Sequence, residues 1–281
     1  MQSVSSWFEI PSPFETAPGS VLLADPPQTS IRKLQAMLLN ETYPKPFVID
    51  DGELLTLYFN IRLMQSIMRH DDPNALEFRY TQKMMSFLLF NPAPKRITLI
   101  GMGGGSLVKF CRHHLPTCHM TAVESDADVI VFRDVFQLPP DGPRLQVLHV
   151  DGAEYLAGVR KGLDVILVDA FDGLGLAPAL GNREFLESAD DRLAANGQLV
   201  INLAGEKKRY KGLVDEAREV FEDKVVVIPV RGDGNYVLLA FKGGSYPPKW
   251  RSLHKLAREL GDKYGLDFPA YAQEIERVAR G

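Results

Sequence analysis

Short apolar segments broken by Pro and Gly characterise the first 70 residues. Four of them have the length and composition of β-strands, at residues 7–10, 21–24, 47–49 and 54–59. Asp51-Gly52 separates the last two, and an Asp-Gly pair flanked by apolar runs favours a hairpin. The pattern predicts a small N-terminal β-rich domain over residues 1–70.

The pattern changes to helical spacing after Asp72-Pro73, where Asp can cap a helix and Pro fits its first turn. Apolar residues then recur at that spacing, at Leu76, Tyr80, Met84 and Phe87. This predicts one helix of ~18 residues that ends before Pro92.

From Arg96 onward, apolar strands alternate with helices. We expect strands at 97–100, 120–123, 145–150, 165–168 and 199–203, and helices at 106–114, 127–136, 153–159, 183–193 and 207–221. Such alternation predicts a parallel sheet covered on both faces. Two further strands, 225–230 and 236–241, are close enough in sequence for an antiparallel hairpin. The chain thus reads as an α/β domain over 71–245 with a helical tail over 246–281.

Composition excludes several classes of protein. Hydrophobic residues form 45% and charged residues 24% of the 281 residues, as in a folded globular protein. A net charge of -4 gives no global basic field, so we expect a small cationic ligand and no nucleic acid. No apolar run approaches the ~18 residues of a membrane span, and the first residues lack a signal-peptide pattern. We therefore expect a cytoplasmic protein without a membrane partner.

Two cysteines, Cys111 and Cys118, are too few for a four-ligand zinc site. A scattered site with His113, His114 and His119 can be imagined, but buried thiols are the simpler explanation. We expect no metal.

A glycine-rich loop, Gly101-Met-Gly103-Gly104-Gly105-Ser106, follows a predicted strand and precedes a helix. Glycines there let a nucleotide or nucleoside approach the backbone and the helix N-terminus, although a structural turn explains them too. Ser106 breaks the dinucleotide fingerprint, which argues against a nicotinamide dehydrogenase.

Acidic residues follow the next two strands. Glu124 suits hydrogen bonds from two ribose hydroxyls. Asp151-Gly152 could contact an adenine amino group, or Asp151 could cap the helix that follows, and the two roles can coexist.

The fourth strand ends in Asp169-Ala-Phe-Asp172-Gly173, at the carboxyl edge where open α/β sheets bind ligands. Two carboxylates there suit a cationic amine, because one can anchor it and the other can accept its proton. Asp172 could instead cap a loop.

Taken together, these residues give the chain a resemblance to a known family. The order of glycine loop, ribose acid, Asp-Gly and Asp-x-x-Asp resembles the spermidine and spermine synthase family of aminopropyltransferases, which have the AdoMet-dependent methyltransferase (Rossmann-like) fold. Further similar motifs are Tyr58-Phe59-Asn60 with Gln65-Ser66, Arg79-Tyr80, and Gly234-Asn235-Tyr236. The resemblance extends from about Leu54 to Phe241.

The resemblance implies a role for each residue. Gly101, Gly103, Gly104, Gly105, Glu124, Asp151 and Gly152 would bind decarboxylated AdoMet, Asp169 would be the proton acceptor, and Gln65, Tyr80, Asp172 and Tyr236 would line the amine pocket. It also implies a homodimer.

Departures from the family pattern keep two alternatives open. The usual acid of the glycine loop, which selects the decarboxylated cofactor, is replaced by Gly104 or Gly105. After Asp169, two hydroxyl residues of the family pattern are replaced by Ala170 and Phe171, and its proline by Gly173. Bare glycine N–H groups could receive the carboxylate of ordinary AdoMet in a small-molecule methyltransferase. A catalytically idle nucleoside-binding protein is the other alternative.

Overall fold

The computed structural model describes residues 7–26, 29–172, 175–232 and 234–281. Two compact units are distinguished. The first contains the described residues up to Phe78, together with Met102–Phe110 and Asp126–Pro140. The second contains Arg79–Gly101, Cys111–Ser125 and the described residues from Asp141 onward.

The first unit contains a five-stranded antiparallel sheet in the order β1-β2-β3-β4-β5. Its strands are β1 (Phe8–Pro11), β2 (Ser20–Leu23), β3 (Phe47–Asp50), β4 (Leu54–Asn60) and β5 (Leu63–Arg69). The Asp51-Gly52 hairpin is present, because β3 pairs with β4 directly across it. Sequence analysis missed β5, and it also missed helix α1 (Ile31–Leu39), whose Leu34 and Leu38 pack into the core of this unit.

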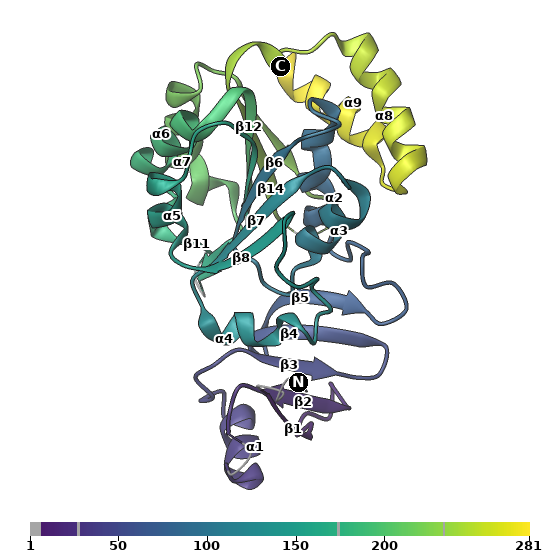
Figure 1. Ribbon diagram of the computed structural model, residues 1–281, viewed down its shortest axis with the longest axis vertical. Coiled ribbons are helices and arrows are strands. Elements are labelled where there is room, and N and C mark those ends of the chain that lie inside the picture. Colours follow the sequence, from purple (N-terminus) through teal and green to yellow (C-terminus); the bar gives the residue numbers. More distant parts are fainter. Residues whose placement is uncertain (1–6, 27–28, 173–174, 233) are drawn as a thin grey trace. The chain divides into compact units, whose positions relative to one another are not determined.

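The second unit contains a seven-stranded sheet in the order β13-β14-β12-β9-β6-β7-β8 (Figure 1). Its strands are β6 (Arg96–Ile100), β7 (His119–Glu124), β8 (Leu145–His149), β9 (Leu163–Val168), β12 (Leu193–Leu203), β13 (Val225–Pro229) and β14 (Tyr236–Phe241). The first five named are mutually parallel, and β14 is antiparallel to β12 and β13. The expected mostly parallel sheet with a terminal antiparallel hairpin is confirmed.

Helices cover both faces of this sheet (Figure 1). On one face lie α5 (Gly152–Gly158), α6 (Arg183–Arg192) and α7 (Lys211–Val220); on the other lie α2 (Arg79–Met84), α8 (Trp250–Tyr264) and α9 (Phe268–Ala279). Helix α3 (Ser106–His114) has the bounds that the sequence predicts. After β9, β10 (Phe171–Asp172) pairs antiparallel with β11 (Gly175–Leu176).

Three predicted helices are shorter in the structure by more than one residue. The one expected at 207–221 is α7, preceded by a 3-10 turn at Lys207–Tyr210. The helix expected from Asp72-Pro73 begins only at Arg79, because residues 72–75 form a turn in which the Ala75 N–H donates to the Asp72 carbonyl. After α2 the chain tightens into a 3-10 helix at Met85–Leu89, whose five residues are all buried. The helix expected at 127–136 is reduced to α4 (Ala127–Ile130) and a 3-10 turn at Val131–Arg133.

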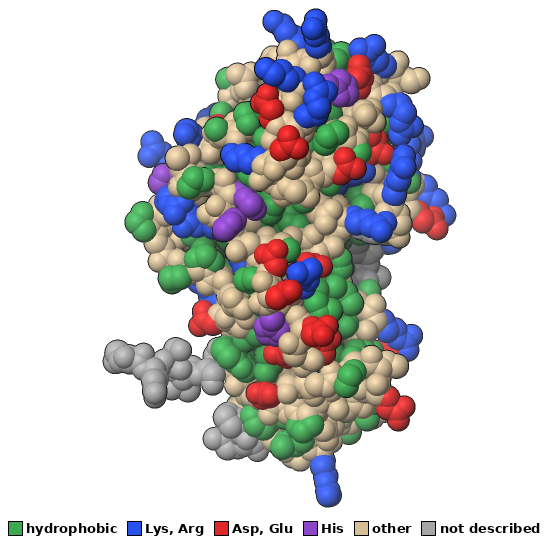
Figure 2. Space-filling view, turned by 90° about the vertical axis from the view of Figure 1, so that its right-hand side faces the viewer, with side chains coloured by type: hydrophobic (Ala, Val, Ile, Leu, Met, Phe, Trp, Pro, Cys, Tyr) green, Lys and Arg blue, Asp and Glu red, His purple; other side chains and the backbone are tan. Residues whose placement is uncertain are grey.

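The C-terminal helices pack against each other and against the sheet. Helix α9 contacts β13, and both α8 and α9 contact the 3-10 helix Met85–Leu89. Their inner faces are buried, with Leu253, Ala257, Leu260, Phe268, Ala272 and Ile275 among the core residues. Their outer faces carry Lys and Arg side chains, which gather over this end of the unit in Figure 2. No helix in the described ranges is long and apolar enough to cross a membrane.

Candidate active site

The carboxyl ends of four parallel strands form the edge on which the candidate residues lie. Register pairs Ile100 of β6 with Val123 of β7 and with Val168 of β9, so these strands end at one level. Strands β7 and β8 continue on one side of β6, whereas β9 and β12 continue on the other. The strand order therefore reverses between β6 and β9, and open α/β sheets bind their ligands at such a switch point.

Gly101 and Asp169 begin the loops on either side of this switch point. The Asp169 N–H donates to the Ile100 carbonyl at 2.8 Å, and the Gly101 N–H donates to the Val123 carbonyl at 2.9 Å. Gly101 has a φ of +86°, and a Cβ there would lie 2.2 Å from the Asp169 carbonyl oxygen. Only glycine fits this position, and its absence of a side chain brings the glycine loop against the catalytic candidate.

Asp169 lies in a polar network at the carboxyl edge of an apolar sheet. Its Oδ1 accepts a hydrogen bond from Nδ2 of Asn202 at 2.9 Å, and its carboxyl also hydrogen-bonds the Tyr80 side chain. Burial raises the pKa of Asp169 to about 6, although the bonds from Asn202 and Tyr80 lower it by favouring the carboxylate. The result is a carboxylate that is ionised at neutral pH and yet more basic than an ordinary aspartate.

Asn202 is itself oriented by a second amide. Nδ2 of Asn235 donates to Oδ1 of Asn202 at 3.2 Å, which leaves Nδ2 of Asn202 to point at Asp169. Asn202 lies in β12 and is only 1% exposed. Sequence analysis missed both roles. The available signal was a single amide inside an otherwise apolar strand, Leu199-Val-Ile-Asn202-Leu203.

The acids predicted for the nucleoside lie further along the same edge. Half-buried Glu124 ends β7 and pairs in register with His149, the last residue of β8. Asp151 caps α5, since one of its carboxylate oxygens accepts from the N–H groups of Ala153 and Glu154 at 2.8 and 3.0 Å. The N-cap interpretation of Asp151 is therefore confirmed, and its second oxygen is not used by the cap.

Gly152 has a packing reason to be glycine. A Cβ at this position would lie 2.3 Å from Cγ2 of Ile100. Its small size lets α5 pack closely against the strand that leads into the glycine loop.

The remaining glycines of the loop belong to the first unit. Gly103 and Gly105 have φ values of +51° and +71°, which favour glycine. A Cβ at Gly104 would lie 2.7 Å from Oγ of Ser66 and 2.9 Å from the Phe136 ring, and one at Gly105 would lie 2.2 Å from Leu138. Neither position has room for the acid that the family usually carries in this loop.

The predicted amine-binding residues are distributed over several elements. Tyr236 begins β14 and pairs with Leu203, so it lies beside Asn202 at the same sheet edge as Asp169. Asp172 is placed in β10, whereas Gly173 lies outside the described residues. Gln65 is half-buried in β5 of the first unit.

The cysteines have the environment of packing residues. Cys111 and Cys118 are buried free thiols, and burial raises the pKa of both, that of Cys118 to about 11. Thiols with raised pKa values are poor metal ligands, because a metal binds the thiolate. In the part of the chain that the structure describes, no group of three or more His, Cys, Asp or Glu is arranged to hold a metal ion.

Comparison with known proteins shows which family the chain belongs to. The model of the spermine/spermidine synthase domain matches residues 77–228. The polyamine aminopropyltransferase of Chromobacterium violaceum is 35% identical over 85% of this chain and 92% of its own. A probable spermidine synthase from Corynebacterium glutamicum has a TM-score of 0.63 at 22% identity, over 82% of this chain and 91% of its own. A spermidine synthase in complex with the transition-state analogue AdoDATO has a TM-score of 0.64 at 15% identity, over 98% of this chain and 92% of its own. The chain belongs to the spermine/spermidine synthase family.

Proposed function

We propose that this protein transfers an aminopropyl group from decarboxylated AdoMet to a polyamine acceptor, with Asp169 as the general base. The observation that carries the proposal is the Asp169 carboxylate at the switch point of the sheet, held by Asn202 and Tyr80 and with its pKa raised to about 6. Family membership supplies the reaction class.

The raised pKa of Asp169 eases the proton transfer that the reaction requires. An alkylammonium has a pKa near ~10, and each pKa unit corresponds to 1.36 kcal/mol. Moving a proton from it to a carboxylate of ordinary pKa 3.8 costs about 8 kcal/mol, whereas a pKa of about 6 reduces that cost to about 5 kcal/mol. Burial of Asp169 thus contributes about 3 kcal/mol to the formation of a neutral, nucleophilic amine.

Residues of this chain fit the nucleoside part of the cofactor. The close approach of Gly101 leaves backbone exposed at the loop, Glu124 can accept from ribose hydroxyls, and the second carboxylate oxygen of Asp151 can accept from adenine. Decarboxylated AdoMet would supply a carbon beside its sulfonium. The amine nitrogen would bond to that carbon as the carbon–sulfur bond breaks, with methylthioadenosine as the leaving group. A spermidine synthase of related fold forms a complex with the transition-state analogue AdoDATO, and this supports the proposed cofactor.

Side chains at the sheet edge are proposed to bind the amine. Tyr236 would contact it at this edge. The family resemblance also assigns Asp172 and Gln65 to amine binding. The network around Asp169 changes the role proposed for Tyr80, because its side chain contacts the base itself. We therefore assign Tyr80 to holding Asp169 as well as to lining the amine pocket.

Product identification tests the proposal. Purified protein is incubated with decarboxylated AdoMet and a panel of diamines and longer polyamines, and the products are separated by mass spectrometry. The proposal requires methylthioadenosine and an acceptor heavier by one aminopropyl group. A parallel reaction with ordinary AdoMet that yields S-adenosylhomocysteine and a methylated product would replace it by the methyltransferase alternative. Cofactor binding without any product would support the idle alternative.

We also propose that the protein acts in the cytoplasm as a homodimer and does not bind nucleic acid. The family resemblance supports the dimer, and the net charge of -4 supports a cationic small-molecule partner. Light scattering during size-exclusion chromatography measures the mass, for which a dimer of the 31.3 kDa chain is expected and a monomer would contradict the proposal.

A further inference from the structure

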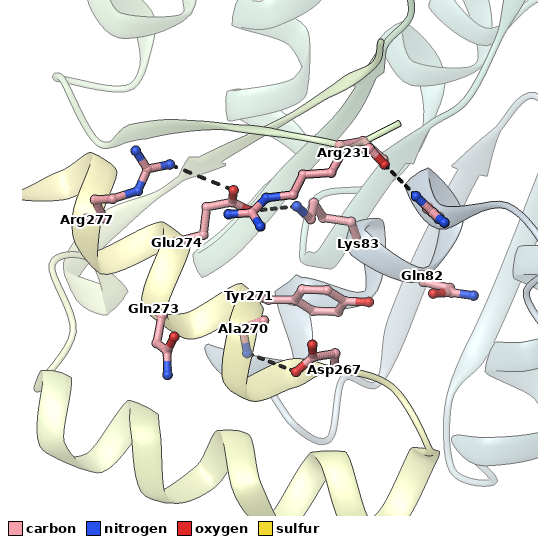
Figure 3. Close-up of a pocket in the computed structure, with 11 residues that line it drawn as sticks. Gln82, Lys83, Arg231, Asp267, Ala270, Tyr271, Gln273, Glu274 and Arg277 are labelled. Atoms are coloured by element: carbon pink, nitrogen blue, oxygen red, sulfur yellow. Dashed lines mark hydrogen bonds and ion pairs between the residues drawn. The ribbon is translucent and has the colours of Figure 1, made fainter. Parts of the chain in front are cut away.

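A pocket in the second unit lies between α2, α9 and the segment that follows β13 (Figure 3). Its volume is about 560 Å³. That volume is within the range of small-molecule sites. No residue predicted for the cofactor or the amine lines it.

The lining of this pocket is positively charged. It contains four cationic side chains, those of Arg79, Lys83, Arg231 and Arg277, and two anionic ones, those of Asp267 and Glu274. The formal charge of the lining is therefore +2, in a chain whose net charge is -4. This excess of positive charge in the pocket disfavours a polyamine as ligand and favours an anion.

Both acids already have structural roles. Glu274 accepts from Nζ of the buried Lys83 at 2.5 Å, and its other oxygen lies 3.8 Å from the Arg277 guanidinium. Asp267 caps α9 by accepting from the Ala270 N–H at 3.1 Å. In Figure 3, Asp267 lies on the opposite side of the Tyr271 ring from Arg231 and Arg277. Glu274 thus pairs with Lys83 and Arg277, whereas in the described part of the chain neither acid of the lining forms an ion pair with Arg79 or Arg231.

Arg79 and Arg231 retain most of their hydrogen-bonding capacity. Nη1 of Arg79 donates to the Arg231 carbonyl at 3.0 Å, which ties α2 to the segment after β13. Both residues are exposed, and neither forms an ion pair with a carboxylate among the described residues. Each guanidinium carries five N–H donors in a planar fork, a geometry that matches phosphate oxygens.

We propose that this pocket binds an anion with two or more phosphate groups. The arginines belong to three separate elements, so a single small anion would engage only part of the set, whereas linked phosphates can reach several. A tetrahedral phosphate presents oxygens in several directions, whereas a carboxylate presents two in one plane. The pocket is therefore better suited to a phosphate chain than to a dicarboxylate of similar charge.

Occupancy of the pocket would stabilise elements that also carry the Asp169 network. Arg79 precedes Tyr80 in α2, and Arg231 lies four residues before Asn235. An anion held by both arginines would restrain this part of the backbone. Hydrogen exchange can follow that effect without any enzymatic activity.

Calorimetric titration with pyrophosphate tests the proposal independently of the proposed function. Wild-type protein should bind it saturably and more tightly than succinate. Loss of a charged donor should weaken binding at least about tenfold in Arg231→Ala and in Arg79→Ala. Arg251→Ala is the matched control, because Arg251 is exposed on α8 and does not line the pocket, and its affinity should equal that of wild type.

Hydrogen exchange with pyrophosphate should show protection in residues 79–84, 230–232 and 234–236 of the wild-type protein and not in Arg231→Ala. Absence of saturable binding, equal affinity in Arg231→Ala and wild type, or equal affinity for succinate would each overturn the proposal. Protection confined to the glycine loop at 101–106 would overturn it too, since it would place the anion at the cofactor site.

Discussion

Replacing Asn202 by Ala tests whether its hydrogen bond sets the basicity of Asp169. The substitution removes the 2.9 Å bond from Nδ2 to the Asp169 carboxylate. This bond favours the charged form and lowers the pKa, so its loss raises the pKa of Asp169 above about 6. A hydrogen bond to a charged group contributes about 1.5–3 kcal/mol, which corresponds to about one to two pKa units. We expect the pKa in Asn202→Ala to be about 7–8.

That shift has a defined effect on the rate. At pH 7 the ionised fraction of Asp169 would fall from about 90% to between about 10% and 50%, which lowers kcat/KM about two- to tenfold. At pH 9 both proteins would hold Asp169 almost fully ionised, so their rates should agree within about twofold. The loss of activity is thus concentrated at low pH.

The assay is methylthioadenosine release at subsaturating amine, measured from about pH 5.5 to 9.5. Asn235→Ala is the matched control: it removes the 3.2 Å bond to Asn202 but leaves both direct partners of Asp169 in place. Its acid limb should move by less than about 0.5 pH unit, since it loses no bond to the charged group itself. An acid limb in Asn202→Ala that coincides with wild type would refute the reasoning, as would an equal loss of rate at every pH.

Three further substitutions address stability. Asp169→Asn should stabilise the fold by up to about 3 kcal/mol at pH 8 and by about 1 kcal/mol less at pH 5. The reason is that a carboxyl whose pKa is raised to about 6 in the folded protein opposes folding increasingly as the pH rises from 3.8 to 6. Urea unfolding at both pH values measures the gain in stability, and an equal gain at both would contradict the prediction. Gly104→Asp should destabilise the fold by about 1–3 kcal/mol and not improve cofactor binding, because its Cβ would lie 2.9 Å from the Phe136 ring. A stable variant that binds the cofactor more tightly in calorimetry would disprove this. Glu274→Ala should lower the free energy of unfolding by about 3 kcal/mol, because it leaves the buried Lys83 ammonium without its carboxylate. The double variant Lys83→Met, Glu274→Leu should recover most of that loss. Thermal unfolding measures both effects, and full stability of the single variant would argue against the prediction.

The fold was largely predictable because strands buried on both faces leave compact apolar runs. Residues 97–100, 165–168 and 236–241 are such runs, and each lies in the sheet of the second unit. The helix boundaries were less predictable. The apolar spacing from Leu76 to Phe87 resembles one helical stripe, yet the first part is a turn and the last part a fully buried 3-10 helix. Periodicity describes which residues face the core, and it does not distinguish these conformations.

The placement of the candidate residues was predictable where they end or follow strands. Gly101, Glu124 and Asp169 were found because parallel strands end at one edge of the sheet, and the structure places all three there. Asn202 and Tyr80 could not be assigned in this way. Their contacts with Asp169 depend on the positions of β12 and α2 in the folded chain, which spacing along the sequence does not reveal.

The central claim is that Asp169 removes the proton of an attacking amine during aminopropyl transfer. Single-turnover release of methylthioadenosine by wild-type protein and by Asp169→Asn, each first shown by calorimetry to bind decarboxylated AdoMet, tests it most directly. We predict equal cofactor affinity and a rate at least about 100-fold lower in Asp169→Asn, the lower range for loss of a general base. Equal rates in the two proteins would contradict the claim, because the network around Asp169 would then have no part in the chemistry.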